Sequence, residues 1–414
     1  MTTTINKEQK NPNVPNKQEH NQTCLSSAER DGLRPKGNVP NLRFPEFEGE
    51  WEKCKLGDAS EFSKERVNTQ NLSSDNYVAT ENMLQDYQGF IEASSVPTNT
   101  NVVKFNKGDV LLSNIRPYLK KVWFADKNGG CSADVFVFKA LSACIPDFLH
   151  YIIANDRFIN FAMSGAKGVK MPRGDKEQMK TYEIGLPSIE EQKKIATLLQ
   201  LLDERIATQN KIIEDLKKLK CAIIETEYNG KGHEYRIGDI IDQVSQRNKR
   251  CLVNTVLSVN NKLGFINQDE QFEDRTVASE DTSNYKVVFK DDFAYNPARI
   301  NVGSIARLKS FDKGIVSPMY ICFKVTDGIV PEYLESYFAT NHFFKEMQKR
   351  LEGSVRLCLS FEGLCNIPIF VPCIDEQTEI GKRIYQLENK IKTECNILSL
   401  YEKQKQYLLR QMFI

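Results

Sequence analysis

The residues with the plainest chemical meaning are lysines and arginines in segments broken by glycine and proline. Segment 164–180 (SGAKGVKMPRGDKEQMK) carries five bases against two acids. Its bases are Lys167, Lys170, Arg173, Lys176 and Lys180. Further candidates of the same kind are Arg116, Lys120, Lys121, Arg299, Arg307, Lys349, Arg350 and Arg356. Because such side chains neutralise phosphates and arginine can fork onto guanine, we predict DNA contacts here, with a solvated surface loop as the alternative.

Catalytic chemistry finds no support in the sequence. A Gly-x-x-x-x-Gly-Lys-Ser/Thr phosphate loop and a Gly-x-Gly-x-x-Gly turn are both absent. Asn296-Pro297-Ala298-Arg299 comes nearest to an adenine-methylation motif, but it lacks the aromatic residue that would stack a flipped base. Glu191-x-Lys193 would suit a nuclease, yet it begins a heptad helix, and we interpret it as helix-start charge. We therefore predict no catalytic residues and a protein that is not an enzyme.

Composition excludes several classes of protein. The 414 residues include 56 basic and 55 acidic side chains, so with a net charge of +1 any anion-binding surface must be local. An apolar content of 40% and a mean hydropathy of −0.46 exclude a membrane protein and a wholly disordered one. Eleven cysteines without a Cys-x-x-Cys pair, and only four histidines, disfavour a zinc site. With no signal peptide, we expect a cytoplasmic protein without metal or membrane contact.

The candidate residues lie within an internal duplication. LPSIEEQ at 186–192 returns as VPCIDEQ at 371–377, and KLGD at 55–58 returns as RIGD at 236–239. The separation stays near 185 residues along most of the chain. Each half contains short β-rich runs, then an amphipathic helix, then a long helix. We predict an α+β protein with two similar β-rich globules related by a pseudo-two-fold internal repeat.

The duplication also divides the chain. Residues 1–40 are rich in Asn, Gln, Lys, Thr and Pro, and we interpret them as a disordered leader. The parts expected after it are a globule at 41–186, a long helix at 187–228, a globule at 229–371 and a long helix at 372–414.

Both long helices carry a heptad seam. In the first helix the seam positions are Ile195, Leu199, Leu202, Ile206, Gln209, Ile213 and Leu216. In the second they are Ile380, Ile384, Leu387, Ile391, Glu394, Leu398 and Tyr401. An apolar stripe of this kind needs a partner helix, so we expect a coiled coil within the chain. The short link between the first helix and the second globule favours an antiparallel pair.

A stiff helix pair suits a ligand that repeats along a line. Over its full length each seam spans about 43 Å, a little more than one DNA turn of ~34 Å. We expect the two globules, held apart by the helices, to read two short sequences on one duplex. Differences between their surfaces would make the whole site asymmetric.

The repeated segments LPSIEEQKKIATLLQLLDERI and VPCIDEQTEIGKRIYQLENKI resemble the two conserved repeats of type I restriction–modification specificity subunits. The opening PNLRFPEFEGEWEKCKLGD resembles the same family, and the resemblance covers about residues 41–414. It implies that the globules are target-recognition domains, each reading one half of a bipartite DNA site. It also implies antiparallel helices that set the spacer between the half-sites.

The resemblance implies partners as well. Two modification (methyltransferase) subunits would dock on the helices, and restriction (translocase/nuclease) subunits would join them. S-adenosylmethionine, ATP and Mg²⁺ would belong to those partners, so this chain would have no cofactor of its own. Two other hypotheses stay open: a coiled-coil adaptor with two heads that do not bind DNA, which the near-neutral composition favours, and a self-contained nuclease or methyltransferase.

Overall fold

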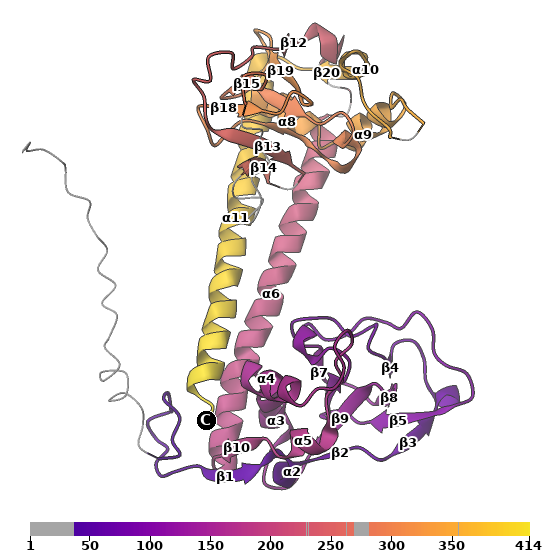
Figure 1. The fold of residues 1–414 in the computed structure, drawn as a ribbon, viewed down its shortest axis with the longest axis vertical. Coiled ribbons are helices and arrows are strands. Elements are labelled where there is room, and N and C mark those ends of the chain that lie inside the picture. The colour runs from indigo at the N-terminus through magenta and orange to yellow at the C-terminus, as the bar shows by residue number, and fades with distance from the viewer. Residues whose placement is uncertain (1–36, 229, 231, 262, 269–280, 355) are drawn as a thin grey trace, which may run out of the picture. The chain divides into compact units, whose positions relative to one another are not determined.

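The computed structural model describes residues 37–228, 230, 232–261, 263–268, 281–354 and 356–414 (Figure 1). It divides into two compact units, which we describe separately. Unit 1 comprises the chain up to Leu202 together with Gln404–Ile414, and unit 2 comprises Asp203–Lys403. Most of the predicted disordered leader, residues 1–36, lies outside the described residues. No helix in the described ranges has an apolar stretch long enough to cross a bilayer.

Unit 1 is built on two four-stranded sheets and a two-stranded ribbon. The ribbon pairs β1 (Glu52–Lys55) with β10 (Glu183–Leu186). One sheet has the order β2 (Ser60–Phe62), β9 (Val135–Ala140), β6 (Val110–Ser113) and β7 (Val122–Phe124). The other has the order β3 (Arg66–Asn68), β5 (Asn101–Phe105), β8 (Gly129–Cys131) and β4 (Tyr77–Val78). The helices are α2 (Leu56–Ala59), η1 (Thr69–Asn71), η2 (Pro117–Leu119), α3 (Pro146–Ile153), α4 (Asp156–Ser164) and α5 (Lys176–Lys180).

Unit 2 repeats this plan. Its ribbon pairs β11 (His233–Arg236) with β20 (Pro368–Val371). Its sheets have the orders β12 (Ile241–Val244), β19 (Ile321–Val325), β16 (Phe293–Tyr295), β17 (Ile305–Arg307), and β14 (Gly264–Asn267), β13 (Val256–Asn260), β18 (Lys313–Val316), β15 (Lys286–Phe289). Its short helices are η3 (Ile237–Asp239), η4 (Ile300–Val302), α8 (Pro331–Tyr337), α9 (Asn341–Gln348) and α10 (Phe361–Cys365). The predicted duplication of an α+β globule is therefore confirmed.

The two units differ at both edges of one sheet. The central pairings agree, because β4 is parallel to β8 in unit 1 and β13 is parallel to β18 in unit 2. Unit 1 extends this sheet with β3 beside β5, where the described residues of unit 2 have an isolated bridge between Arg247 and Lys286. Unit 2 instead adds β14 beside β13. The two units thus share the core of this sheet and differ in the strands at its periphery, where loops tolerate change.

A buried glutamine explains why the EEQ/DEQ motif occurs in both halves. Gln192 Oε1 accepts a hydrogen bond from the backbone of Ile145 at 2.9 Å, and Gln377 Oε1 accepts one from Val330 at 2.9 Å. Each glutamine Nε2 also donates to the carbonyl of the proline that precedes the long helix, at 3.0 Å in both units. Because both side chains are fully buried, these bonds satisfy backbone groups that water cannot reach. The motif therefore ties each long helix to its own globule.

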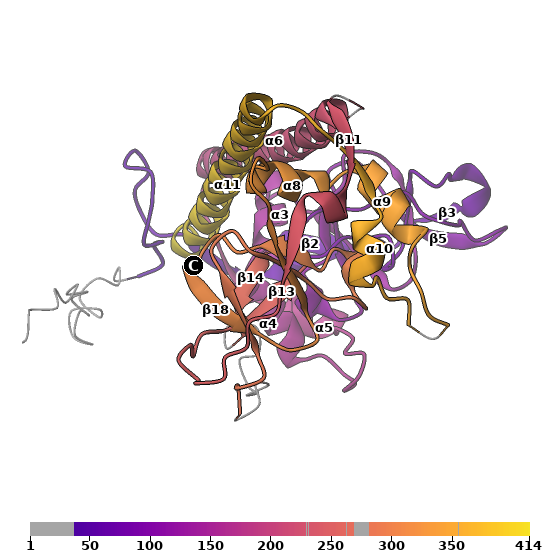
Figure 2. The same ribbon diagram turned by 90° about the horizontal axis from the view of Figure 1, so that it is seen from above.

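The long helices are α6 (Ile189–Glu227) and α11 (Ile374–Gln411), of 39 and 38 residues. Within unit 2 they lie side by side in both views (Figures 1 and 2). Gln209 Nε2 lies 3.2 Å from the carbonyl oxygen of Glu394, and Lys220 Nζ lies 2.5 Å from Glu388 Oε1. As residue numbers rise along α6 they fall along α11, so the predicted antiparallel pairing is confirmed.

None of the fourteen predicted seam residues is exposed, but they do not all face the partner helix. Ile195 and Leu199 belong to the core of unit 1, and Ile380 and Ile384 belong to the core of unit 2. The first two layers of each seam thus pack against a globule, and the inter-helix seam is correspondingly shorter than the heptad count suggests. At its centre the buried Glu394 also pairs with Lys390 at 2.6 Å. A satisfied polar layer of this kind fixes the register of a helix pair.

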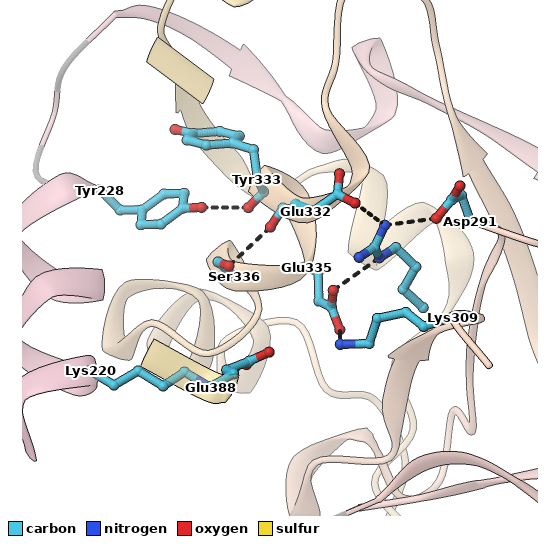
Figure 3. Close-up of polar contacts among 10 residues, drawn as sticks. Lys220, Tyr228, Asp291, Lys309, Glu332, Tyr333, Glu335, Ser336 and Glu388 are labelled. Atoms are coloured by element: carbon cyan, nitrogen blue, oxygen red, sulfur yellow. Dashed lines mark hydrogen bonds and ion pairs between the residues drawn. The ribbon is translucent and has the colours of Figure 1, made fainter. Parts of the chain in front are cut away.

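The helix α6 begins in unit 1 and ends in the core of unit 2. The helix α11 begins in unit 2 and ends in the core of unit 1. In unit 1, Phe413 stacks on Phe148 with ring centroids 5.1 Å apart, and Arg157 Nη1 donates to the carbonyl of Phe413 at 2.9 Å. In unit 2, the buried Tyr228 hydroxyl donates to the carbonyl of Tyr333 at 2.5 Å (Figure 3). Each globule is therefore completed by residues from the other half of the chain.

Glu191 lies in the first turn of α6, as its interpretation as helix-start charge expects, and it has a second role there. Its carboxylate is buried and accepts two hydrogen bonds from Arg43, both at 2.8 Å. The indole of Trp51 donates a third at 3.3 Å. Arg43 and Trp51 flank the start of the first globule, so this carboxylate anchors the beginning of the folded chain to α6. Its counterpart Glu376 is exposed, so the contact belongs to unit 1.

Candidate nucleic-acid interface

In unit 1 the basic loop folds back onto the end of β6. Lys167 and Arg173 exchange two backbone hydrogen bonds of 2.9 Å, which close the loop. The segment that leaves the loop is then fixed by a hydrogen bond of 2.8 Å from the backbone nitrogen of Arg116 to the carbonyl of Pro172. We call residues 113–121, 132–134 and 164–176 the loop face of unit 1. The structure therefore brings together candidates that lie about 50 residues apart in the sequence.

Unit 2 builds the same loop at the equivalent place in the repeat. Glu352 and Cys358 exchange backbone hydrogen bonds of 2.9 and 2.8 Å, and the nitrogen of Leu359 donates to the carbonyl of Pro297 at 3.0 Å. Arg299 precedes η4 just as Arg116 precedes η2. We call residues 296–304, 317–320, 352–354 and 356–358 the loop face of unit 2.

The candidate cations of unit 1 lie on or beside its loop face, and they differ in their exposure and in the partners of their charged groups. Lys167 and Lys170 are exposed, and Lys167 Nζ lies 3.1 Å from Asp175 Oδ2. The exposed Arg173 lies 3.3 Å from Asp134 Oδ1. Surface pairs of this kind contribute about 0–1 kcal/mol, so a phosphate can replace the carboxylate at little cost.

Four further unit 1 candidates are held more firmly. Arg116 adopts a left-handed backbone conformation with φ of 51°, and its buried Nε has no partner among the described atoms. Lys120 Nζ pairs with Asp156 at 2.8 Å, and Lys121 Nζ donates to the carbonyl of Thr80 at 2.7 Å. Lys176 Nζ lies 4.8 Å from the ring centroid of Phe136, and desolvation at this position lowers its pKa. These cations are positioned by the fold, which favours defined contacts over a diffuse basic surface.

In unit 2 two candidates are exposed on the loop face and two lie beside it. Arg299 and Arg356 are exposed. Lys349 and Arg350 both pair with Glu346 on α9, at 2.5 and 2.6 Å. These are local helix pairs, so both cations remain near the surface with part of their charge compensated.

Arg307 was predicted as a DNA contact on a loop, but it is the last residue of β17 and is buried. Its side chain is 7% exposed, and its guanidinium pairs with Asp291 at 2.7 Å, Glu332 at 2.5 Å and Glu335 at 3.0 Å. These three carboxylates are labelled in Figure 3. Lys309 pairs with the other oxygen of Glu335 at 2.7 Å. Burial lowers the pKa of Arg307, but the carboxylates outweigh this effect and hold the pKa above its usual value. Arg307 therefore joins β17 to α8 inside unit 2.

Replacing Arg307 by methionine is expected to lower the free energy of unfolding of unit 2 by about 2 kcal/mol, because charged hydrogen bonds contribute about 1.5–3 kcal/mol each and the carboxylates can regain water. Lys309→Met is the matched control, since it removes only a half-exposed pair and should cost less than about 1 kcal/mol. Urea unfolding followed by circular dichroism measures both. Equal effects of the two variants would contradict the structural role of Arg307.

The sequence reasoning missed a basic turn in unit 2. Buried Asn248 donates to the carbonyl of Val253 at 2.9 Å and accepts from its nitrogen at 3.2 Å, so one side chain holds the turn. Lys249 and Arg250 project from this turn and are exposed. The turn adjoins Lys286 at the start of β15 through an isolated β-bridge. Lys286 is in turn the strand partner of the last residue of β18, which lies beside the loop face. The run Arg247-Asn248-Lys249-Arg250 was a visible signal.

The described residues contain no group of three His, Cys, Asp or Glu side chains that could hold a metal ion. The loop faces instead present exposed guanidinium and ammonium groups, on loops that backbone hydrogen bonds hold in place. Such groups bind phosphates and base edges.

Known proteins have a related sequence and a similar fold. The sequence matches the family described as Type I restriction modification DNA specificity domain over residues 48–218 and again over 231–400. The Type I restriction enzyme MjaVIII specificity subunit of Methanocaldococcus jannaschii is 24% identical over 408 residues, which cover 89% of this chain and 92% of that relative.

Solved structures show the same fold at low sequence identity. The type I restriction–modification system S subunit from M. genitalium gives a TM-score of 0.56 at 17% identity, covering 91% of this chain and 99% of that chain. A chain solved for complex assembly and conformational transition of the type I R-M system gives 0.53 at 17% identity, covering 87% and 96%. Two copies of the family's domain account for most of the sequence and coincide with the two halves that fold alike. The chain therefore belongs to the Type I restriction modification DNA specificity family, as a specificity subunit and not an enzyme.

Proposed function

We propose that this specificity subunit binds a bipartite, asymmetric double-stranded DNA site, with the loop face of each unit reading one half-site. The observation that carries the proposal is the repeated loop itself. Loops 167–173 and 352–358 close with the same pair of backbone bonds, and each docks beside an arginine that precedes a 3-10 helix. The closing bonds agree while the side chains differ, as two readers of different sequences require.

The helix pair would set the spacing between the half-sites and dock the partner subunits. Exposed apolar residues lie on the helices outside the seam and support a docking role: Leu201, Ile212, Leu219, Tyr385, Leu400 and Tyr407. Two modification (methyltransferase) subunits would bind there, and restriction (translocase/nuclease) subunits would join that core. S-adenosylmethionine, ATP and Mg²⁺ would be used by those partners. The complex would act on DNA in the cytoplasm.

The decisive experiment first identifies the site and then measures binding. Methylome sequencing of cells with and without the gene gives the candidate site. The chain, assembled with its modification subunits, is then titrated with duplexes carrying that site, either half-site alone, or scrambled sequence at one fixed salt concentration. We expect the complete site to bind at least 10³-fold more tightly than scrambled DNA. Equal affinity for all duplexes would refute the proposal.

The coiled-coil adaptor remains the second candidate function, because the near-neutral net charge of +1 does not by itself attract DNA. It predicts that the basic loop of unit 1 has no part in DNA affinity. Charge reversal on that loop therefore separates the two functions.

Changing Lys167, Lys170 and Arg173 together to glutamate is expected to weaken DNA binding and flatten its salt dependence, because each lost phosphate contact reduces the slope of log K against log salt by about 0.9. Equilibrium titrations at several salt concentrations measure both quantities. The matched control reverses Lys53, Lys55 and Lys107, three exposed lysines of unit 1 outside its loop face. The adaptor function would be favoured if both triple variants bound DNA like the parent chain.

A further inference from the structure

The two loop faces differ in chemistry at one pair of equivalent positions. In unit 1, Arg173 and Asp134 form an exposed ion pair. In unit 2 the residues at the corresponding positions of the repeat are Cys358 and Met319. The backbone bonds that close the loops are the same in both units, so this exchange leaves the loop framework in place. It changes the chemistry that the surface offers.

Met319 belongs to an apolar patch on the loop face of unit 2. Val302 is 52% exposed, Met319 59% and Leu357 49%. The segments that carry them meet at Asn296 and Pro297. Asn296 Nδ2 lies 3.8 Å from Met319 Sδ, and the loop carrying Leu357 is bonded to the carbonyl of Pro297 at 3.0 Å. An exposed apolar group is unremarkable singly, but three on one small face indicate a contact surface.

Two cations flank this apolar patch. Arg299 lies three positions before Val302, and Arg356 is next to Leu357. Both are exposed, and within the described ranges neither guanidinium has a carboxylate at ion-pair distance. The patch is therefore complementary to a ligand that places anionic groups around an apolar one. A protein partner with an apolar anchor would need acidic neighbours spaced to match both arginines, whereas DNA supplies phosphates on either side of its groove.

The DNA major groove offers one apolar group, the 5-methyl of thymine, which is recognised by apolar side chains. We propose that unit 2 reads thymine methyl groups in its half-site through Val302, Met319 and Leu357, while Arg299 and Arg356 hold the flanking phosphates. Unit 1, with Asp134 and Arg173 at the same place, reads its half-site by polar contacts. This inference rests on the proposed function and specifies which chemical group the second half-site must contain.

Deoxyuridine substitution tests the proposal, because it removes the methyl group and leaves base pairing intact. The full chain with its modification subunits is titrated with the methylome-derived site, in which the thymines of one half-site at a time are replaced by deoxyuridine. One half-site should lose about four-fold in affinity for each contacted methyl group, as expected for a buried methyl-sized group. The double variant Met319→Ala, Leu357→Ala should bind the natural site more weakly and lose that sensitivity.

The control is Phe289→Ala, which removes a 43% exposed apolar side chain at the other end of β15 from the loop face. It should keep the sensitivity to deoxyuridine. Affinity unchanged by deoxyuridine in both half-sites would overturn the inference while leaving the proposed function intact, as would sensitivity that persists in the double variant. A complex that binds every duplex equally would refute the proposed function, and the inference with it.

Discussion

A chain with Leu387 replaced by proline is expected to lose recognition of the complete bipartite site. Leu387 is a half-buried seam residue in the interior of α11. Proline there removes a backbone hydrogen bond, clashes with the preceding turn and costs about 3 kcal/mol or more. The break falls within the part of α11 that pairs with α6, near the contact between Lys220 and Glu388. Binding to the complete site should fall to the level of a single half-site.

Two variants separate the broken helix from other causes. Leu387→Ala removes the same side chain without breaking the helix and should retain preference for the complete site, with a stability loss of about 2–3 kcal/mol or less at this half-buried position. Ile374→Pro places proline at the first position of α11, where no intrahelical bond is needed, and should also retain it. Far-UV circular dichroism reports the helix content of each variant. A proline variant that kept its full site preference would show that the helix pair is not the spacer.

Lengthening both helices by one heptad is expected to change the site rather than abolish binding. The heptad added to α6 is a second copy of Asn210–Leu216, inserted after Leu216. The heptad added to α11 is a second copy of Ile384–Lys390, inserted after Lys390. Both insertions keep the seam in phase. Both insertions lie between the Gln209–Glu394 and Lys220–Glu388 contacts. Seven residues add about 10 Å, or about three base-pair steps. The preferred spacer between the half-sites should grow by about that number.

Selection from duplexes with spacers of graded length measures the new preference. Insertion of the heptad into α6 alone is the control, since it separates the two contacts in one helix only and should weaken binding without defining a new spacer. An unchanged spacer preference in the doubly extended chain would count against the proposed role of the helices.

The duplication, the heptad seam and the antiparallel pairing were predictable because they depend on patterns that are local or repeated in the sequence. A seam residue keeps its spacing whatever surrounds it, and all fourteen predicted positions avoid full exposure. The local pairing of Glu346 with Lys349 and Arg350 follows the same helical spacing. The turn at 247–250 was equally visible as a run of basic residues.

Solvent exposure of a charged side chain was decided only by the tertiary structure. Arg299 and Arg307 lie eight positions apart in the same repeated segment, yet one is exposed and the other is enclosed by Asp291 and two carboxylates from α8. Glu191 is buried because Arg43, 148 positions away, lies against it. The sequence alone determined which elements form, because periodicity is a property of neighbouring residues, and how the long helices pair, because the link after the first helix is short. Which cations remain free for a ligand depends on groups that meet only after distant segments have packed, so no local pattern contained it.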